Sequence, residues 1–154
     1  MTESLDETDW AILHEVQQDG RIAFTELARR VNLSASATTE RVRRLEAAAV
    51  ITGYRAEVGL ERTGYAVLAV VRLKYPGNRH EPLHRLLAEC PEILECLRTT
   101  GDDCYVLKVA TTSVSDLERI VDTLAQFGST TTNLVLNQTL PYRGPRVPRT
   151  PREG

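Results

Sequence analysis

Apolar residues recur every three or four positions along the first 50 residues, which is the spacing of helices that bury one face. The pattern predicts helices over residues 6–19, 24–31 and 35–48. Asp6 and Ser34 have side chains suited to cap the first and the third of these helices. The side chains expected to be buried are Leu5, Ile12, Leu13, Val16, Leu27, Ala28, Val31, Thr38, Val42 and Leu45.

After residue 50 the apolar positions take on the alternation that is typical of strands. A linking strand is predicted over residues 51–58, before a series of strands and helices. The expected strands of this series are 65–75, 93–100, 104–111 and 131–140, and the expected helices are 81–90 and 114–127. The resulting order is βαββαβ, which is that of ferredoxin-like folds. An α+β chain is therefore predicted, with a three-helix N-terminal domain and a ferredoxin-like C-terminal domain.

These elements divide the chain into four parts. We expect a helical domain over residues 1–50, a linking strand and hinge over 51–63, and the ferredoxin-like domain over 64–140. The remaining residues, 141–154, are rich in proline and arginine and are predicted to be disordered or extended.

Composition limits the classes of function. No apolar run approaches the 18 residues of a membrane span, and the acidic, polar N-terminus lacks the features of a signal peptide, so a cytoplasmic location and no membrane partner are expected. Cys90, Cys96 and Cys104 form no CxxC pair and are expected to be reduced thiols. The net charge is −2, and four arginines lie in the last 12 residues. A surface that binds nucleic acid must therefore be a local concentration of positive charge.

Residues 24–48 have the layout of a helix-turn-helix: a short helix, a tight turn at 32–34 and a second helix. Small and polar side chains at the start of the second helix would let its backbone approach base edges, and the arginines that follow can reach guanine edges or phosphates. The candidate DNA contacts are Ser34, Ser36, Ala37, Thr39, Glu40, Arg41, Arg43 and Arg44. On this local pattern alone, an ordinary surface helix with solvated charges fits as well.

Five segments together resemble the Lrp/AsnC, or feast/famine, family of prokaryotic transcriptional regulators. They read LDETDWAIL, DGRIAFTELARRVNLSASATTERVRRLEAAAVITGYRAEV, GYAVLAVVRL, TTGDDCYVLKV and TTTNLVL, and they run nearly from one end of the chain to the other. The resemblance implies a DNA-binding regulator that forms dimers, often assembled into octamers. It also implies that an amino acid or a related small molecule binds between regulatory domains.

The resemblance places the effector site at a loop and a strand of the C-terminal domain. The candidate residues are Gly101, Asp102, Asp103, Cys104, Tyr105, Thr130, Thr131 and Thr132. The chain departs from the family here, because Cys104 stands where an acid is usual and Asp103 precedes it. It also has Ala49 where the family usually has glycine, which predicts a less sharply bent end of the recognition helix. A tight turn and a polar strand remain the alternative interpretation of the loop and the threonines.

The expected partners are double-stranded DNA, a small-molecule effector that resembles an amino acid, and further copies of this chain, with no cofactor. Dimerisation is expected through an exposed sheet face rich in Val, Leu and Ile. One alternative is an architectural DNA-binding protein without a ligand. Another is a metal-dependent hydrolase, because His80 and His84 match the HExxH pattern of zinc proteases. Pro82 lies between these histidines and predicts a solvated helix start there instead.

Overall fold

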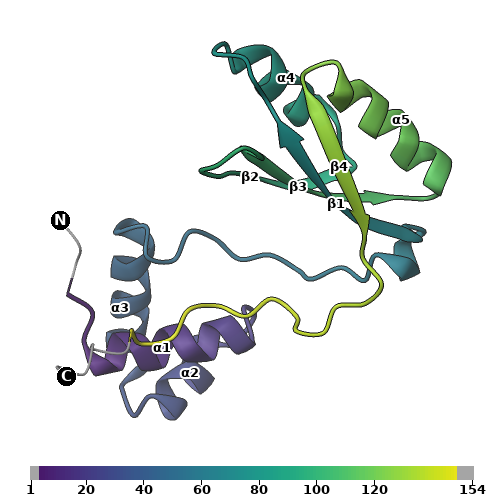
Figure 1. Cartoon of the computed structure of the whole chain (residues 1–154). Coiled ribbons are helices and arrows are strands. Elements are labelled where there is room, and N and C mark those ends of the chain that lie inside the picture. The colour runs from purple at the N-terminus through teal and green to yellow at the C-terminus, as the bar shows by residue number, and fades with distance from the viewer. Residues whose placement is uncertain (1–3, 149–154) are drawn as a thin grey trace, which may run out of the picture. The chain divides into compact units, whose positions relative to one another are not determined.

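The computed structural model describes residues 4–148, which form two compact units. One unit combines residues up to 57 with residues from 140 onward, and the other spans Val58–Thr139. The first unit contains three helices (Figure 1), which are α1 (Glu7–Gln18), α2 (Phe24–Arg30) and α3 (Ala35–Ala47). The periodicity of apolar residues predicted all three to within one or two residues at each end.

The three helices share one apolar core. Its fully or almost fully buried side chains are Ile12, Leu13, Leu27, Val42 and Leu45. These were all expected from helical spacing, as were Leu5, Val16 and Val31, which pack against the core while remaining partly exposed. Trp10 and Ile22 also pack against this core and were not predicted.

The turn between α2 and α3 is built by one residue in a left-handed conformation. Asn32 has φ 55°, a region that asparagine tolerates better than most residues. The amide of Leu33 donates to the carbonyl of Ala28 at 2.9 Å, which closes the end of α2. The Ser34 hydroxyl then accepts from the amide of Ala37 at 3.2 Å and caps α3, as predicted.

The expectation that Ala49 weakens the bend after α3 was wrong. Ala49 itself adopts the left-handed conformation, with φ 54°. Its amide donates to Glu46, and the amide of Val50 donates to Leu45, at 3.0 and 2.9 Å. This is the hydrogen-bond pattern with which glycine-terminated helices end, and Val50 packs against the core next to Leu45. The bend after α3 is thus formed, although it requires the backbone of Ala49 to adopt an unfavourable conformation.

Ala49→Gly is therefore expected to stabilise the N-terminal unit by about 0.5–1 kcal/mol. The left-handed conformation costs an alanine about 1–2 kcal/mol, part of which is offset by the greater entropy of glycine in the unfolded chain. Thermal unfolding followed by the fluorescence of Trp10, the single tryptophan, measures the change. Ala48→Gly is the matched control, because Ala48 has φ −80°, and it should lower the melting temperature. A variant at position 49 that melts no higher than the wild type contradicts this account.

The predicted linking strand at 51–58 was also wrong: residues 52–58 are in no strand of the described structure. The alternation of apolar and polar residues does not form a strand unless a neighbouring strand accepts its hydrogen bonds. Instead, the Tyr54 hydroxyl donates to the Glu46 carboxylate at 2.9 Å, and its ring lies over Gly20. Burial and the Glu46 carboxylate raise the pKa of Tyr54 to about 12. The start of the link is therefore fastened to the helical unit by one side chain.

The second unit is a four-stranded antiparallel sheet with the order β2-β3-β1-β4. Its elements are a short 3₁₀ turn (Glu61–Thr63), β1 (Val67–Lys74), α4 (Glu81–Glu89), β2 (Ile93–Arg98), β3 (Tyr105–Thr111), α5 (Val114–Ala125) and β4 (Ser129–Leu134). The ferredoxin-like fold is thus confirmed. The last strand was predicted too long, because β1 offers no pairing partner beyond Leu134 and Val135. No helix between residues 4 and 148 is long and apolar enough to cross a membrane.

The two faces of this sheet differ. Both helices, α4 and α5, cover one face (Figure 1), where Val71, Leu73 and Leu107 are completely buried. Alternate residues of the strands point to the opposite face, which carries Leu68, Val70, Leu97, Val106 and Ala110. Leu97 is 53% exposed. Arg72, Lys108 and Thr131 lie on this same face, so the sheet has a partly apolar face that neither of its own helices covers.

Candidate nucleic-acid interface

The outward face of α3 is polar at its start and cationic further along. Ser36, Glu40 and Arg43 are exposed, opposite the buried Val42 and Leu45. No carboxylate of residues 4–148 forms an ion pair with Arg43, although Glu40 lies one turn before it. Arg43 is thus an exposed cation on a helix face, and its guanidinium is available to an outside partner.

The first two turns of α3 are arranged by hydrogen bonds among small side chains. The hydroxyls of Ser34 and Ser36 lie 3.1 Å apart, and Thr39 donates to the carbonyl of Ala35 at 2.8 Å. Ala37 contributes only a methyl group. The helix start is therefore narrow, and nothing bulky prevents a nucleic-acid backbone or base edge from approaching it.

Two other arginines of α3 are held by a buried carboxylate on α1. Asp9 is only 1% exposed. Its carboxylate accepts from Arg41 Nη1 at 2.8 Å and from Arg44 Nη2 at 2.7 Å. Arg41 also donates to Asp6 at 2.7 Å. These bonds join the start of α1 to the middle of α3, so the recognition helix is fixed before any partner binds.

Asp6 and Asp9 perform this task because they also cap α1. The amide of Asp9 donates to the Asp6 carboxylate at 2.7 Å, and the amide of Asp6 donates to the Asp9 carboxylate at 3.2 Å. The hydrogen bond from Arg41, more than the neighbouring amides, lowers the pKa of Asp6, and the same contact raises the pKa of Arg41. The Asp6 carboxylate is thus held in its charged form at the junction of α1 and α3.

Sequence reasoning placed Arg41 and Arg44 among the DNA contacts, and the structure gives them a second role. Their charges are largely matched by acidic groups of their own unit, and the Arg41 side chain is only 29% exposed. Contact between either residue and phosphate remains a prediction. Asp9 was missed because it is separated from its partners by 32 and 35 residues, and no local pattern records such a contact.

A second group of charges ties α2 to α1. Glu26 accepts from both Arg29 and Arg30, and Arg30 also donates to Glu15, each at 2.8 to 2.9 Å. The hydrogen bonds from Arg29 and then Arg30 lower the pKa of Glu26 to about 2. Arg29 and Arg30, like Arg41 and Arg44, therefore have carboxylate partners within the unit.

The candidate effector loop is a tight turn between β2 and β3. Gly101 has φ 98°, which favours glycine, and Thr99 closes the turn by donating from its hydroxyl to the carbonyl of Asp103 at 2.6 Å. The amide of Thr99 donates to the carbonyl of Cys104 at 2.9 Å. The loop is thus held in one shape by its own hydrogen bonds.

The loop at 101–104 and the strand β4 lie on opposite sides of the end of β1. Asp103 forms an ion pair with Arg72 at 3.4 Å, and Asp102 forms one with Lys74 at 3.1 Å. Across β1, Thr131 is paired in register with Arg72. Asp103, Arg72 and Thr131 are therefore neighbours on the open face of the sheet. The register of the sheet creates this group, in which Arg72 was not predicted.

Other predicted effector residues lie elsewhere. Thr130 and Thr132 are paired with Leu73 and Val71, so their side chains point to the face that the helices cover. The Cys104 thiol is partly buried at the end of β1, where the amide of Tyr75 donates to it at 3.4 Å. Tyr105 is 2% exposed. Of the eight candidates, Asp102, Asp103 and Thr131 present side chains beside the open face, and Gly101 shapes the turn.

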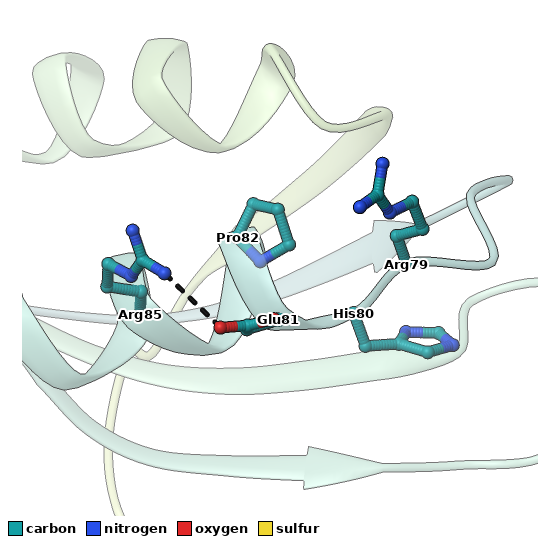
Figure 2. A pocket seen from close by; sticks show the side chains of 5 residues that line it. All are labelled: Arg79, His80, Glu81, Pro82 and Arg85. Atoms are coloured by element: carbon teal, nitrogen blue, oxygen red, sulfur yellow. Dashed lines mark hydrogen bonds and ion pairs between the residues drawn. The ribbon is translucent and has the colours of Figure 1, made fainter.

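Tyr105 joins the two histidines of the HExxH pattern. Its hydroxyl lies 2.8 Å from His80 Nδ1 and 3.0 Å from His84 Nε2. The prediction of a solvated helix start was therefore incomplete, because both imidazoles have a protein partner. His80 also lines a surface hollow with Arg79, Glu81, Pro82 and Arg85 (Figure 2). Among residues 4–148 no three His, Cys, Asp or Glu side chains are grouped so as to hold a metal ion.

Two family models cover most of the chain. One, described as the AsnC-type helix-turn-helix domain, matches residues 5–46, and the other, described as the Lrp/AsnC ligand binding domain, matches residues 68–145. The chain belongs to the Lrp/AsnC family. It is a DNA-binding transcriptional regulator of this family, and its C-terminal unit is a ligand-binding domain.

Individual relatives agree with this assignment of the Lrp/AsnC protein. The uncharacterized HTH-type transcriptional regulator YezC of Bacillus subtilis is 38% identical over 133 residues, which cover 86% of this chain and 94% of the relative. The feast or famine regulatory protein of M. tuberculosis in complex with L-methionine has a TM-score of 0.85 at 31% identity, with 92% and 98% of the two chains covered. A transcriptional regulator of Neisseria meningitidis in complex with L-Met has a TM-score of 0.83 at 28% identity, with 89% and 93% covered.

Proposed function

We propose that this Lrp/AsnC protein recognises specific DNA sequences by placing α3 in the major groove. The outward face of α3 carries this proposal, because Arg43 is exposed and without an ion pair among the described residues, on a helix that Asp9 fixes to α1. Ser36 and Thr39 supply hydroxyls near the helix start, and Glu40 can accept from a cytosine amino group. A fixed helix loses less conformational entropy when it binds, which favours a defined set of base contacts.

We further propose that the protein acts as a homodimer, or as an octamer built from dimers. The apolar residues on the uncovered face of the sheet, which are Leu68, Val70, Leu97 and Val106, support pairing of two copies. A two-fold dimer presents two copies of α3 to DNA. Selection of bound duplexes from a random pool should therefore yield pseudo-palindromic sites, with half-sites about 10–10.5 bp apart or a multiple of this spacing. Recovery of single, unpaired half-sites would contradict the dimeric mode of binding.

The effector we propose is an amino acid or a close analogue, bound at the open face beside the loop. A zwitterion has one carboxylate and one ammonium group, and Arg72 and Asp103 are suited to bind these groups respectively. The Thr131 hydroxyl, across β1 from the Asp103 loop, can donate to the same carboxylate. The L-methionine complexes of two structural relatives support this choice of ligand class.

Asp103→Ala is expected to abolish the response to the effector while leaving basal DNA binding nearly intact. The change removes the acceptor for the ammonium group and lies outside the helical unit. The measurement is the change in DNA affinity or oligomer size on titration with a panel of amino acids. Asp122→Ala is the matched control, since Asp122 is an exposed carboxylate on α5 and should leave the response unchanged.

The second candidate function is ligand-independent DNA binding. It is favoured by the ion pairs of Asp103 with Arg72 and of Asp102 with Lys74, since these charges already satisfy one another. A wild-type protein that responds to none of the amino acids, or an Asp103→Ala variant that still responds fully, would support this alternative. The loop would then be only a turn.

A further inference from the structure

In the C-terminal tail, arginine and proline each recur at every third position. Residues 143–152 read RGPRVPRTPR, so that an Arg-x-Pro unit occurs three times and a fourth arginine follows. The arginines of this repeat are Arg143, Arg146, Arg149 and Arg152. Proline at every third position disfavours helices and central strands and favours the polyproline II conformation.

A period of three has a geometric consequence in that conformation. Polyproline II has three residues per turn and rises about 3.1 Å per residue, so residues three apart lie on the same edge, about 9 Å from one another. Arg143 and Arg146 would then lie on one edge of the tail, and Pro145 and Pro148 would lie on another. A row of guanidinium groups on an extended, stiff segment is suited to a linear array of anionic groups.

The beginning of the tail is fastened to the DNA-binding unit. Residues from Leu140 onward belong to the same compact unit as α1, α2 and α3. The Gln17 side chain of α1 donates to the carbonyl of Pro145 at 3.2 Å. Gly144 lies so close to this Gln17 side chain that a Cβ atom at Gly144 would collide with it. The tail therefore begins against the helices that carry the recognition helix.

The described arginines of the tail are exposed and make no internal ion pairs. Arg143 and Arg146 are both in exposed positions, and neither has a carboxylate partner among residues 4–148. Arg29, Arg30, Arg41 and Arg44 of the helical unit, in contrast, are all engaged with carboxylates. Arg143 and Arg146 are thus cations whose charge no described carboxylate matches, as are Arg21, Arg43 and Arg55.

The balance of charge in the unit also points to the tail. Residues 1–57 contain seven arginines and ten acidic residues, which is unfavourable for association with a polyanion. Residues 140–154 add four arginines and one glutamate. They restore an equal number of basic and acidic residues in the unit that must approach DNA.

We infer that the Arg-x-Pro tail is a second DNA-binding element, which lies along the phosphate backbone of the duplex beside the site read by α3. This inference rests on the proposed function of α3. At the polyproline II rise, Arg143 and Arg146 would lie about 9 Å apart on one edge of the tail, where both can face the phosphates of one strand. Because phosphates carry no sequence information, the tail adds affinity without adding specificity.

The test compares the full-length protein with a variant in which all four arginines are replaced by glutamine (R143Q, R146Q, R149Q and R152Q). Removing four phosphate contacts should reduce the slope of log affinity against log salt concentration by about 3–4 per bound chain. Affinity at 0.15 M salt should fall on the order of 10–100-fold, and by the same factor for cognate and unrelated duplexes. Replacing the same four residues by lysine keeps the charge and should restore most of the slope.

The outcomes separate this inference from the proposed function. A glutamine variant with unchanged salt slope and affinity overturns the inference, while sequence-specific binding by the wild type still supports α3 as the reader. A tail that contacts an acidic protein instead of DNA gives this same unchanged result. A wild-type protein that binds no duplex overturns the proposed function and the inference together. A glutamine variant that loses affinity only for the cognate sequence also contradicts the inference, because it would assign base contacts to the tail.

Discussion

Replacement of Asp9 by alanine should destabilise the N-terminal unit by about 2–4 kcal/mol. Removing one member of a buried ion pair costs about 3–5 kcal/mol, and the partial exposure of Arg41 and Arg44 reduces this value. The change also removes the acceptor for the backbone amide of Asp6 at the start of α1. A core of this size seldom supplies more than about 3–5 kcal/mol, so a large part of the unit would be unfolded near 37 °C.

Denaturant unfolding followed by Trp10 fluorescence tests this expectation, because the only tryptophan of the chain packs against the core of this unit. Glu7→Ala is the matched control. Glu7 is an exposed acid in the first turn of the same helix, and its loss should cost only about 0.3–1 kcal/mol through the helix dipole. If Asp9→Ala were no more destabilising than Glu7→Ala, the carboxylate would not fix α3 in the way described.

Replacement of Arg43 by alanine should weaken binding to the cognate site by about 1–3 kcal/mol while the fold stays intact. Arg43 is exposed and has no ion pair among the described residues, so its removal breaks no internal contact, whereas a lost bidentate contact to guanine costs this amount. The measurement is the affinity for a cognate and for a scrambled duplex at one salt concentration. The ratio of the two affinities should fall, because discrimination at one base position is lost.

The control for this measurement is Arg119→Ala, since Arg119 is a similarly exposed arginine on α5 of the other unit. It should leave the affinity ratio unchanged. An Arg43→Ala variant that keeps its full affinity ratio would remove Arg43 from the recognition face. Arg41 and Arg44 are poorer test positions, because their replacement also disturbs the contacts of Asp9, and a loss of affinity would be mixed with a loss of stability.

Local patterns in the sequence predicted the elements of both units because the physical causes are themselves local. Ile12 and Leu13 on α1, and Val42 and Leu45 on α3, are spaced so that each helix buries one face. The cap at Ser34 depends on the amide of Ala37, only three positions away. The same reasoning identified the outward face of α3. The local pattern therefore predicted which side chains of α3 face outward, but it could not predict which of them form ion pairs with residues far away in the sequence.

The remaining features depend on contacts between distant segments. The pairing of Thr131 with Arg72 requires the order of strands in the sheet, and the ion pairs of Asp9 require the packing of α1 on α3. The prediction of a strand at 51–58 failed for a related reason. Alternation of apolar and polar residues shows that a segment can pair in a sheet, but it does not show whether a partner strand is present. The prediction for Ala49 failed for a different reason: the hydrogen bonds that end α3 outweighed the preference of alanine for negative φ.

Arg98 and the Tyr105 hydroxyl together determine which imidazole nitrogens of His80 and His84 donate and which accept. Arg98 Nη2 lies 3.2 Å from His80 Nε2 and can only donate, so this nitrogen accepts and the proton of His80 is on Nδ1. His80 then donates to Tyr105, and Tyr105 donates to His84 Nε2. A second proton on His80 would be on Nε2 and would face the Arg98 guanidinium, which is another donor. Burial, and then the charges of Arg98 and His84, lower the pKa of His80 accordingly. Neutral His80 thus contributes stability that is fully present above about pH 6.5 and is lost as the pH falls through the lowered pKa of His80 in the folded chain.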